Sequence, residues 1–136
     1  MRIVIAAALA LAFASAVEKH SVTVNPTDVA WQKVEIPGVP PGMLQKPLHD
    51  NKSKQMMSAI FRFPKGFRDP RHYHTTCGHS LYLLKGKLQT PDGVLTPGMF
   101  MYSALNERHG PLVALEETDM LIYTDGPLDY HLAEGK

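Results

Sequence analysis

Apolar and polar residues alternate in a series of short segments along most of the chain. Each segment lies between prolines and glycines, and no segment shows the 3.6-residue period of a convincing amphipathic helix. Alternation with a period of two predicts strands that bury one face. The predicted strands are residues 21–26, 28–36, 55–63, 79–90, 94–104, 111–117 and 119–126.

Proline and glycine mark the connections between these segments. The sequence PGVPPG at 37–42 predicts a stiff loop, and Pro91-Asp92-Gly93 predicts a turn between two strands. Residues 127–136 are interpreted as a tail. About eight to ten short strands, in a chain with 11 prolines, predict an all-β fold, closed or in two sheets, such as a jelly roll.

Composition supports one domain behind an export signal. A chain of 136 residues with 44% hydrophobic residues can build one core and is too short for two ordinary domains. Arg2 precedes an apolar run that ends in Ala14-Ser15-Ala16, a pattern typical of a secretory signal peptide. An uncleaved anchor or a buried helix is the alternative, although the run is short for a membrane span. We therefore expect a signal peptide at 1–16, a single domain at 17–136, and a secreted or periplasmic protein.

Charge and cysteine content narrow the function classes. Removal of 1–16 takes away Arg2 and no acidic residue, so that 13 basic residues would balance the 13 acidic ones. A neutral domain has no electrostatic footprint for nucleic acid or an anionic membrane, and we expect neither partner after signal cleavage. Cys77 is the single cysteine, so an intramolecular disulfide cannot form. A packed core, a metal or subunit contacts must hold the fold.

Three of the seven histidines fall within eight residues of one another. In a strand, His72 and His74 point to one side while Arg71 and Tyr73 point to the other. Two imidazoles on one edge can occupy adjacent positions around a divalent ion, and His79 on the following strand can add a third. A lone histidine on an apolar face is more often a packed residue, but this spacing, with His109 as a fourth candidate, favours metal binding.

The same segment resembles the first motif of the cupin superfamily. That motif is a Gly, five residues, His-x-His, three or four residues, Glu, six residues and Gly. Here Gly66, His72, His74 and Gly86 fit every spacing, and His79 occupies the position of the Glu. The resemblance is therefore to a cupin with histidine in place of the usual acid.

The second cupin motif follows in the correct order. It is a Gly, five residues, Pro-x-Gly, two residues and His, and Gly98 to His109 keeps this spacing. Ala104 replaces the Pro and Asn106 replaces the Gly. Asparagine tolerates the left-handed backbone conformation, so we expect the turn before His109 to survive.

The resemblance covers residues 55–125 and implies a fold, a site and a quaternary structure. It implies a double-stranded β-helix, the jelly-roll cupin barrel, with a metal inside the barrel near one mouth. It also implies a homodimer, for which 21–36 could supply an edge. By this carry-over the ligands of one divalent transition metal ion (Fe, Mn, Zn, Ni or Cu) are His72, His74, His79 and His109.

Other residues near the motif have alternative interpretations. Cys77 is a loop thiol near the metal, unless it is a soft ligand in place of His79 or a redox-active thiol. Arg68, Arg71 and Arg108 are candidate partners of a substrate carboxylate, but exposed loop charges are the commoner case.

The functional hypothesis combines the ligand set with the resemblance. Four neutral imidazoles leave a divalent ion its full charge, which favours an anionic chelating substrate such as an enolate or a phenolate. We expect a secreted metal-dependent cupin with dioxygenase-like chemistry and a small-molecule substrate, and no residue stands out as a general base. The alternatives are a non-catalytic module that binds a metal or small ligand, as when four ligands close a tetrahedral zinc site, and a metal-free isomerase with histidine acids and bases.

Overall fold

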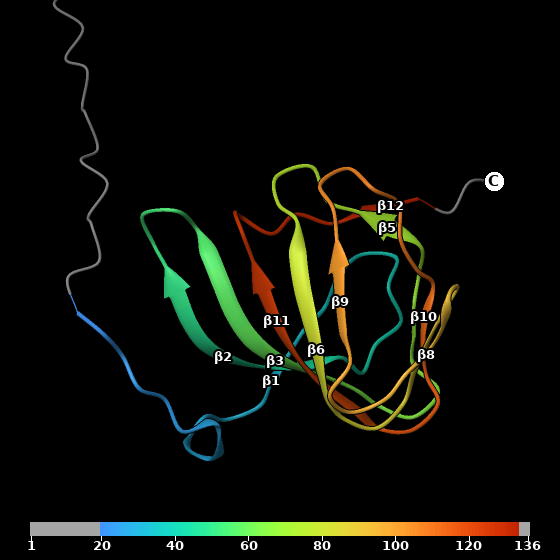
Figure 1. Cartoon of the computed structure of the whole chain (residues 1–136), viewed down its shortest axis with the longest axis horizontal. Helices are drawn as coiled ribbons and strands as arrows, with labels where there is room; N and C mark the ends of the chain where they lie inside the picture. The colour runs from blue at the N-terminus through green and yellow to red at the C-terminus, as the bar shows by residue number, and fades with distance from the viewer. Residues whose placement is uncertain (1–19, 134–136) are drawn as a thin grey trace, which may run out of the picture.

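The computed structural model describes residues 20–133, and the expected signal peptide at 1–16 lies outside them. The described residues form strands with one turn of 3-10 helix near the N-terminus (Figure 1). In chain order the elements are η1 Pro26–Asp28, β1 Gln32–Lys33, β2 Leu44–Asn51, β3 Met56–Phe63, β4 Arg68–Asp69, β5 His72–Tyr73, β6 His79–Lys85, β7 Leu88–Thr90, β8 Gly93–Leu95, β9 Phe100–Ser103, β10 Leu112–Ala114, β11 Thr118–Thr124 and β12 His131–Leu132.

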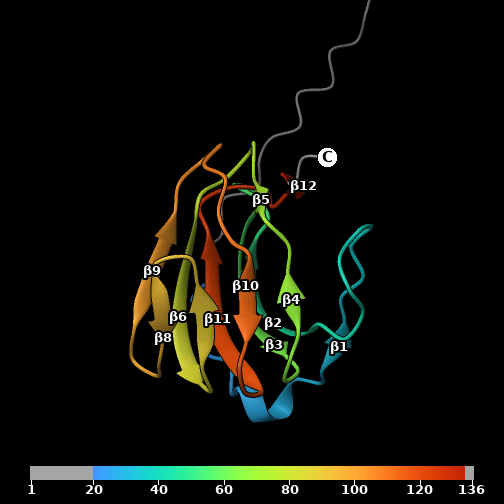
Figure 2. The same cartoon turned by 90° about the vertical axis from the view of Figure 1, so that its right-hand side faces the viewer.

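The strands form two sheets and a short pair. One sheet has the order β1-β2-β3-β11-β6-β9, the second has the order β4-β10-β7-β8, and β12 pairs with β5. Each of these pairings is antiparallel. Figure 2 looks onto β4, β8 and β10, with the six-stranded sheet behind them. Two curved antiparallel sheets around a common interior confirm the predicted all-β, jelly-roll barrel.

Several of the segment predictions need correction. Residues 21–25 form no strand, and only Gln32–Lys33 of 28–36 does. Residues 79–90 and 94–104 are each divided into two strands that belong to different sheets, because the chain turns at Gly86 and Gly98 with positive φ. Strand β2 was not predicted, since LQKPLHDN lacks regular alternation and contains a proline. Residues 127–136 are not a simple tail, because β12 pairs with the His72–Tyr73 strand.

The predicted strand faces are confirmed in the centre of the six-stranded sheet. In β3, Ala59, Phe61 and Phe63 are buried, while Ile60 and Arg62 between them are partly exposed. In β6, the inward positions are buried and alternate with the partly exposed Ser80 and the exposed Tyr82. Strand parity therefore directs His79, Leu81 and Leu83 to the inside.

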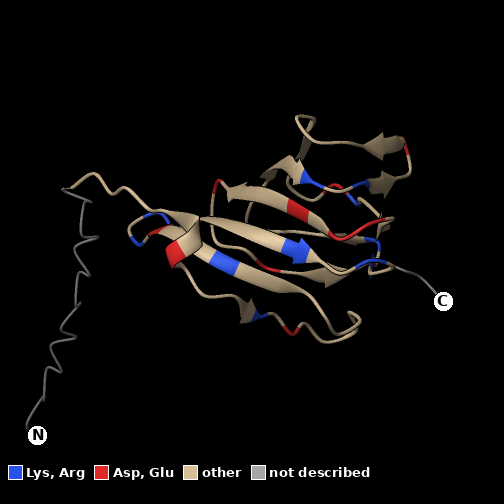
Figure 3. Cartoon of the chain, turned by 90° about the horizontal axis from the view of Figure 1, so that it is seen from below, with Lys and Arg blue, Asp and Glu red and all other residues tan. Residues whose placement is uncertain are grey.

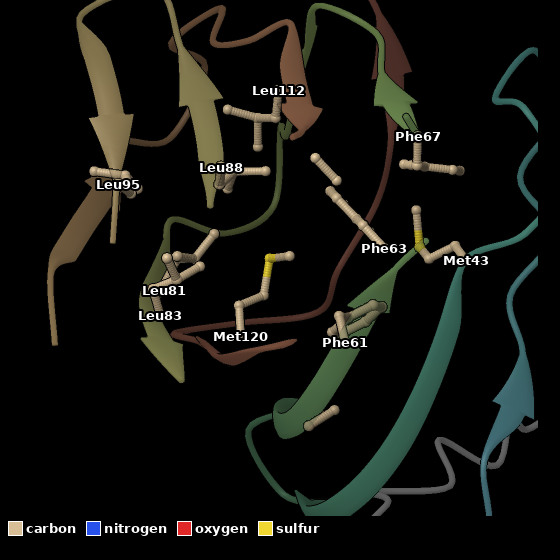
Figure 4. Close-up of a cluster of buried hydrophobic side chains, with 12 residues drawn as sticks. Met43, Phe61, Phe63, Phe67, Leu81, Leu83, Leu88, Leu95, Leu112 and Met120 are labelled. Atoms are coloured by element: carbon tan, nitrogen blue, oxygen red, sulfur yellow. The ribbon is translucent and has the colours of Figure 1, made fainter. Parts of the chain in front are cut away.

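The barrel interior is a dense apolar cluster to which both sheets contribute (Figure 4). Burial of a large apolar side chain contributes about 1.5–3 kcal/mol, so this cluster supplies the main driving force for folding. Phe63 and Phe67 pack ring to ring, with centroids 4.6 Å apart. The cluster consists of Met43, Ala59, Phe61, Phe63, Phe67, Leu81, Leu83, Leu88, Leu95, Leu112, Ala114 and Met120.

Gly86 closes the first motif at the end of the barrel opposite the histidines. Its φ angle is +88°, and a Cβ atom there would lie 2.3 Å from the backbone oxygen of Glu117. A side chain would therefore meet both backbone strain and a backbone clash. The glycine allows β6 to turn tightly against the start of β11.

The outer face of the six-stranded sheet divides into a covered half and a bare half. On β2 and β3, Trp31 lies over Lys46 and Arg62, with ring-centroid distances of 4.8 and 4.2 Å. On β6 and β9, Tyr82 and Phe100 stand opposite each other in register and are 43% and 60% exposed. Figure 3 shows basic and acidic residues interspersed, without a face of one sign.

Among the described residues, no helix is long and apolar enough to cross a membrane.

Candidate metal centre

Four strands and loops bring the predicted histidines together at one end of the barrel. His72 begins β5, His79 begins β6, and His74 follows β5 directly. His109 pairs with His72 through two backbone hydrogen bonds of 2.9 and 3.0 Å. The turn before His109 contains Asn106 with φ of +63°, the left-handed conformation predicted for it.

One ring nitrogen from each histidine lies within 4.8 Å of the others. The Nε2 atoms of His79 and His109 are 3.2 Å apart. Two nitrogens bound to one ion at bond lengths of about 2.1 Å would be about 3.0–3.4 Å apart in octahedral or tetrahedral geometry. The spacing of this pair therefore suits neighbouring ligands of a single ion.

Backbone carbonyls orient three of the four rings. Nδ1 of His72 donates to the Pro70 carbonyl at 2.7 Å, Nδ1 of His109 donates to that of Glu107 at 3.1 Å, and Nδ1 of His74 donates to that of Asp129. Because a carbonyl only accepts, the proton sits on Nδ1 and the Nε2 lone pair is free. This arrangement is common for metal-binding histidines.

Burial keeps the imidazoles neutral, as metal ligands must be. Burial, together with the neighbouring histidines, lowers the pKa of His72 and of His79 to about 3, although the hydrogen bond to the Pro70 carbonyl acts to raise that of His72. It also lowers the pKa of His74 and His109, against the raising effect of their hydrogen bonds to backbone carbonyls.

Two buried nitrogens of the group have no hydrogen-bond partner in the described part of the chain. These atoms are Nε2 of His74 and Nδ1 of His79. A buried polar nitrogen without a partner costs about 1–3 kcal/mol. A divalent ion would satisfy the first by direct coordination. The donor set therefore fits a metal that prefers nitrogen ligands, such as Zn, Cu, Ni or Fe.

The C-terminal segment holds the loop that follows the His72–Tyr73 strand in place. Besides its carbonyl bond to His74, Asp129 accepts hydrogen bonds from the backbone NH groups of Thr75 and Thr76 and from the Thr75 hydroxyl. Desolvation raises the pKa of Asp129, but hydrogen bonds from Thr75, Thr76 and His131 outweigh it, so that the pKa is lowered overall. The loop after the His72–Tyr73 strand is therefore anchored by the Asp129 carboxylate, which stays ionised.

An apolar cavity of about 60 Å³ borders the histidines on the inside of the barrel. His72, His74 and His79 line one side, and side chains such as Phe61, Leu81 and Met120 line the rest. A water molecule needs roughly 10–15 Å³ of such space, so the cavity has room for a small molecule that spans a few water-sized positions.

Asp69 is a site residue that the sequence did not reveal. It lines the cavity, is 6% exposed, and accepts a 2.7 Å hydrogen bond from the Tyr130 hydroxyl. Desolvation raises the pKa of Asp69 to about 7, against the lowering effects of Tyr130 and Arg68. Tyr130 also stacks on the His72 ring, with centroids 4.2 Å apart and planes 19° apart. Tyr130 lies far along the chain from the motif, in the segment that the sequence analysis interpreted as a tail, and this concealed the Asp69–Tyr130 pair.

The arginines lie outside this cavity. Arg71 and Arg108 line a separate pocket that His109 also borders, together with Glu107 and Asp92. Arg108 packs over the Tyr73 ring at 4.6 Å. Of the arginines considered from the sequence, none lines the inner cavity, so a substrate held there would not meet them.

Cys77 is buried beside the site without taking part in the four-histidine group. It is 2% exposed, and burial together with Asp125 and Asp129 raises its thiol pKa to about 11. Its sulfur, His74 and Asp129 form a second compact group. The Asp129 carboxylate in that group is already occupied by Thr75 and His131. A neutral, buried thiol favours the loop interpretation over a reactive cysteine.

The site predictions can now be compared with the structure. His72, His74, His79 and His109 form the expected cluster, and Leu81 points inward beside His79. Phe61 and Phe63 also line the cavity, whereas Met99 is 43% exposed and Tyr102 is 53% exposed.

Comparisons with known proteins agree with this architecture. Residues 19–129 match the family model of the ChrR cupin-like domain. No match to a curated protein is found for the sequence.

Three solved structures illustrate the shared fold. A Methylibium petroleiphilum PM1 protein assigned as an acetylacetone dioxygenase is 23% identical, with a TM-score of 0.73 over 88% of this chain and 86% of that one. An acetylacetone dioxygenase from Acinetobacter johnsonii is 20% identical, with a TM-score of 0.65 over 89% of this chain and 83% of that one. The anti-sigma factor ChrR of Rhodobacter sphaeroides, solved with SigE, is 19% identical, with a TM-score of 0.59 over 74% of this chain and 52% of that one.

At these identities the structural neighbours establish the fold, and the family model establishes membership across most of the chain. The cupin barrel, its two motifs and the clustered histidines all agree with that match. The chain belongs to the family of ChrR cupin-like domains.

Proposed function

We propose that this chain is a metal-dependent cupin that acts on a small oxygenated organic molecule in a dioxygenase-like reaction. In this proposal His72, His74, His79 and His109 bind one divalent transition metal ion. The observation that carries it is the group of four neutral imidazoles, three of which line an apolar cavity. The acetylacetone dioxygenases among the structural neighbours support the reaction class.

The residues around the cavity suit this chemistry. A divalent ion bound there would supply Lewis acidity and, if it is redox-active, electron transfer to dioxygen. Three backbone carbonyls hold the imidazoles in one orientation, so the ligands need little reorganisation. Phe61, Leu81 and Met120 exclude water from the substrate and strengthen its polar contacts.

A second candidate is a non-catalytic module that binds a metal or small ligand. Its support is the ligand set itself, because four protein ligands can close a tetrahedral zinc site. The anti-sigma factor among the structural neighbours is a regulatory protein rather than an enzyme. Open coordination positions and a response to oxygen distinguish the two functions.

Oxygen uptake with acetylacetone tests the enzyme directly. Metal-free protein is reconstituted separately with Fe(II), Mn(II), Ni(II), Cu(II) and Zn(II), and dioxygen consumption is recorded with an electrode. We expect uptake with at least one redox-active ion, at a rate reduced to background in the His74→Ala variant. His20→Ala is the matched control, since His20 is exposed and lies outside the cluster.

The competing result is equally clear. Tight binding of zinc, with no uptake of dioxygen for any of the five ions, would favour the binding module over the enzyme.

We also propose that the protein is exported, with residues 17–136 as the mature single domain. The support is the Arg2 n-region, the apolar run after it and the small residues before Val17. N-terminal sequencing of protein from the cell exterior or periplasm should begin at Val17. A protein that retains Met1 in the cell pellet would contradict export.

The bare outer half of the six-stranded sheet supports a homodimer. Tyr82, Leu84, Phe100, Tyr102 and Tyr123 are each between 42% and 60% exposed. None of them is charged, so two copies of this face can meet about a two-fold axis without like-charge repulsion. Four half-exposed aromatic side chains and one leucine offer roughly 500 Å² per copy, a large part of the roughly 800 Å² of a standard interface.

Light scattering coupled to size-exclusion chromatography tests the dimer. We expect a dimer for the native protein and a monomer for Phe100→Lys. A native monomer, or a dimer that Phe100→Lys leaves intact, would place the interface elsewhere or remove it.

A further inference from the structure

Asp69 and Tyr130 are the polar side chains on the cavity wall besides the histidines. The remaining lining side chains are aliphatic, aromatic or methionine, and no Lys or Arg lies among them. A buried carboxyl group in such surroundings is costly unless it has hydrogen-bond partners. The position of the Asp69 carboxyl group beside the histidine cluster therefore suggests that it contacts a ligand there.

Intramolecular contacts use only part of the Asp69 carboxyl group. Oδ1 accepts the Tyr130 hydroxyl at 2.7 Å and lies 3.7 Å from Nδ1 of His72. That nitrogen already donates to the Pro70 carbonyl at 2.7 Å, so it does not satisfy Asp69. Within residues 20–133, Oδ2 of Asp69 makes no hydrogen bond. One carboxyl oxygen is therefore left for a molecule in the cavity.

Tyr130 ties this oxygen to the histidine cluster. Its ring stacks on His72 at a centroid distance of 4.2 Å while its hydroxyl group holds Asp69. The carboxyl group is thus fixed beside a ring whose other nitrogen belongs to the four-histidine group. A small molecule that reaches this cluster from inside the cavity also reaches Asp69.

The cavity restricts the chemical class of this molecule. About 60 Å³ excludes sugars and polycyclic compounds. The lining carries the Asp69 carboxyl group and no Lys or Arg, so a second anionic group of a ligand would meet an acidic side chain at that end of the cavity. A ligand that suits both ends offers two neighbouring oxygens to the histidine cluster and carries a hydroxyl proton for Asp69.

We propose that Asp69, positioned by Tyr130, is the specificity-determining hydrogen-bond acceptor of the site and selects small α-hydroxy ketones over the corresponding diketones. The hydroxyl proton of such a ligand meets Oδ2 of Asp69 while its two oxygens face the histidine cluster. This inference rests on the proposed function, because it takes the inner cavity as the substrate site.

Acetoin and diacetyl test the proposal, because they have the same number of non-hydrogen atoms and only acetoin carries a hydroxyl group. Binding to the Zn-loaded protein is measured by ligand-observed NMR titration, so neither turnover nor dioxygen contributes. A hydrogen bond to a carboxylate typically changes affinity by about tenfold or more. We expect native protein to prefer acetoin by about tenfold.

Variants separate recognition from folding. Asp69→Asn keeps the side-chain shape and should reduce the preference for acetoin several-fold, and Asp69→Leu should abolish it. Tyr130→Phe keeps the ring on His72 and should reduce the preference less than Asp69→Leu. Zinc content and the thermal midpoint of Asp69→Asn should stay close to the native values, which shows that the site is intact.

Equal affinity for acetoin and diacetyl in the native protein, or no binding of either, would overturn the proposal. So would a preference for acetoin that survives Asp69→Leu. The proposed function fails by a different measurement, the absence of oxygen uptake, so the two failures can be told apart.

Discussion

The two ends of the barrel interior are built from the same strands and serve different purposes. Along β6 the inward side chains change from His79 at one end to Leu81 and then Leu83, which is fully buried. Within residues 20–133, the histidine end contains buried nitrogens without hydrogen-bond partners, whereas the other end, around Leu83 and Leu88, is filled with apolar side chains (Figure 4). The histidine end keeps polar groups that a ligand can contact, and the apolar end supplies the stability that compensates for their burial.

Removal of one histidine should have the largest effect on the metal end. His74→Ala deletes a ligand whose Nε2 is buried without a partner. Loss of a second-shell partner already weakens metal binding by about 10–100-fold, so loss of a ligand should exceed about 100-fold. Competition with a chelator of known affinity measures this. If His74→Ala retains the metal as the exposed His20→Ala does, the two ends do not differ in the way described.

Acidification should destabilise the metal-free protein through the same end. His72 and His79 have a folded-state pKa of about 3, and the unfolded value is near 6.5, so the unfolded state binds more protons between these values. Stability is therefore full above about pH 6.5 and falls as the pH drops toward 3. Asp69, with its pKa raised to about 7, acts in the opposite sense over part of this range.

Denaturant titrations of metal-free protein between pH 7.5 and 4.5 check this sign. Zinc should reduce the acid sensitivity, because protons must then compete with the ion. Constant stability of the metal-free protein across this range would mean that the histidines are not buried in the neutral form.

A substitution that creates a cavity at the apolar end should lower the free energy of unfolding and leave metal binding unchanged. Leu83→Ala removes a fully buried side chain and should reduce the free energy of unfolding by about 2–5 kcal/mol. Leu115, just after β10, is 39% exposed and lies outside the proposed dimer face, so Leu115→Ala is a matched control with an expected change within about 0.5 kcal/mol. Metal stoichiometry should be unchanged in both. A large loss of metal in folded Leu83→Ala would show that the two ends are strongly coupled.

The smallest expected effect on metal affinity concerns Asp129, which anchors the loop after the His72–Tyr73 strand. Asp129→Ala removes hydrogen bonds to Thr75 and Thr76 while the backbone carbonyl that accepts from His74 remains. We expect metal affinity to fall by about tenfold, as for other second-shell changes. Isothermal titration with zinc measures it, with His131→Ala as a milder comparison, since His131 contacts one carboxylate oxygen at 2.7 Å. An unchanged affinity in Asp129→Ala would remove the anchoring role of this side chain.

The sequence predicted the clustering of the four histidines better than it predicted their surroundings. Spacing and parity are local properties, so the shared face of His72 and His74 and the inward position of His79 follow from a period of two. The motif resemblance then added His109. These four positions cluster as expected.

Contacts between distant segments were not predictable in the same way. Tyr130 meets Asp69 across 61 residues of sequence, and neither residue belongs to a recognisable pattern. The pairing of β12 with β5 was also missed, since two-residue strands leave no periodicity to detect. The bounds of the short strand β1 and the existence of the irregular strand β2 were not predicted for a related reason, because the pairing of both strands depends on tertiary context.

X-ray absorption spectroscopy of protein purified without added metal, combined with elemental analysis, tests the central claim most directly. We predict one transition metal ion per chain, with first-shell scattering from about four imidazole nitrogens at roughly 2.0–2.2 Å and no sulfur. A sulfur ligand would point to Cys77 instead. Protein that neither retains nor takes up a stoichiometric ion would contradict the claim that these four histidines form a metal centre.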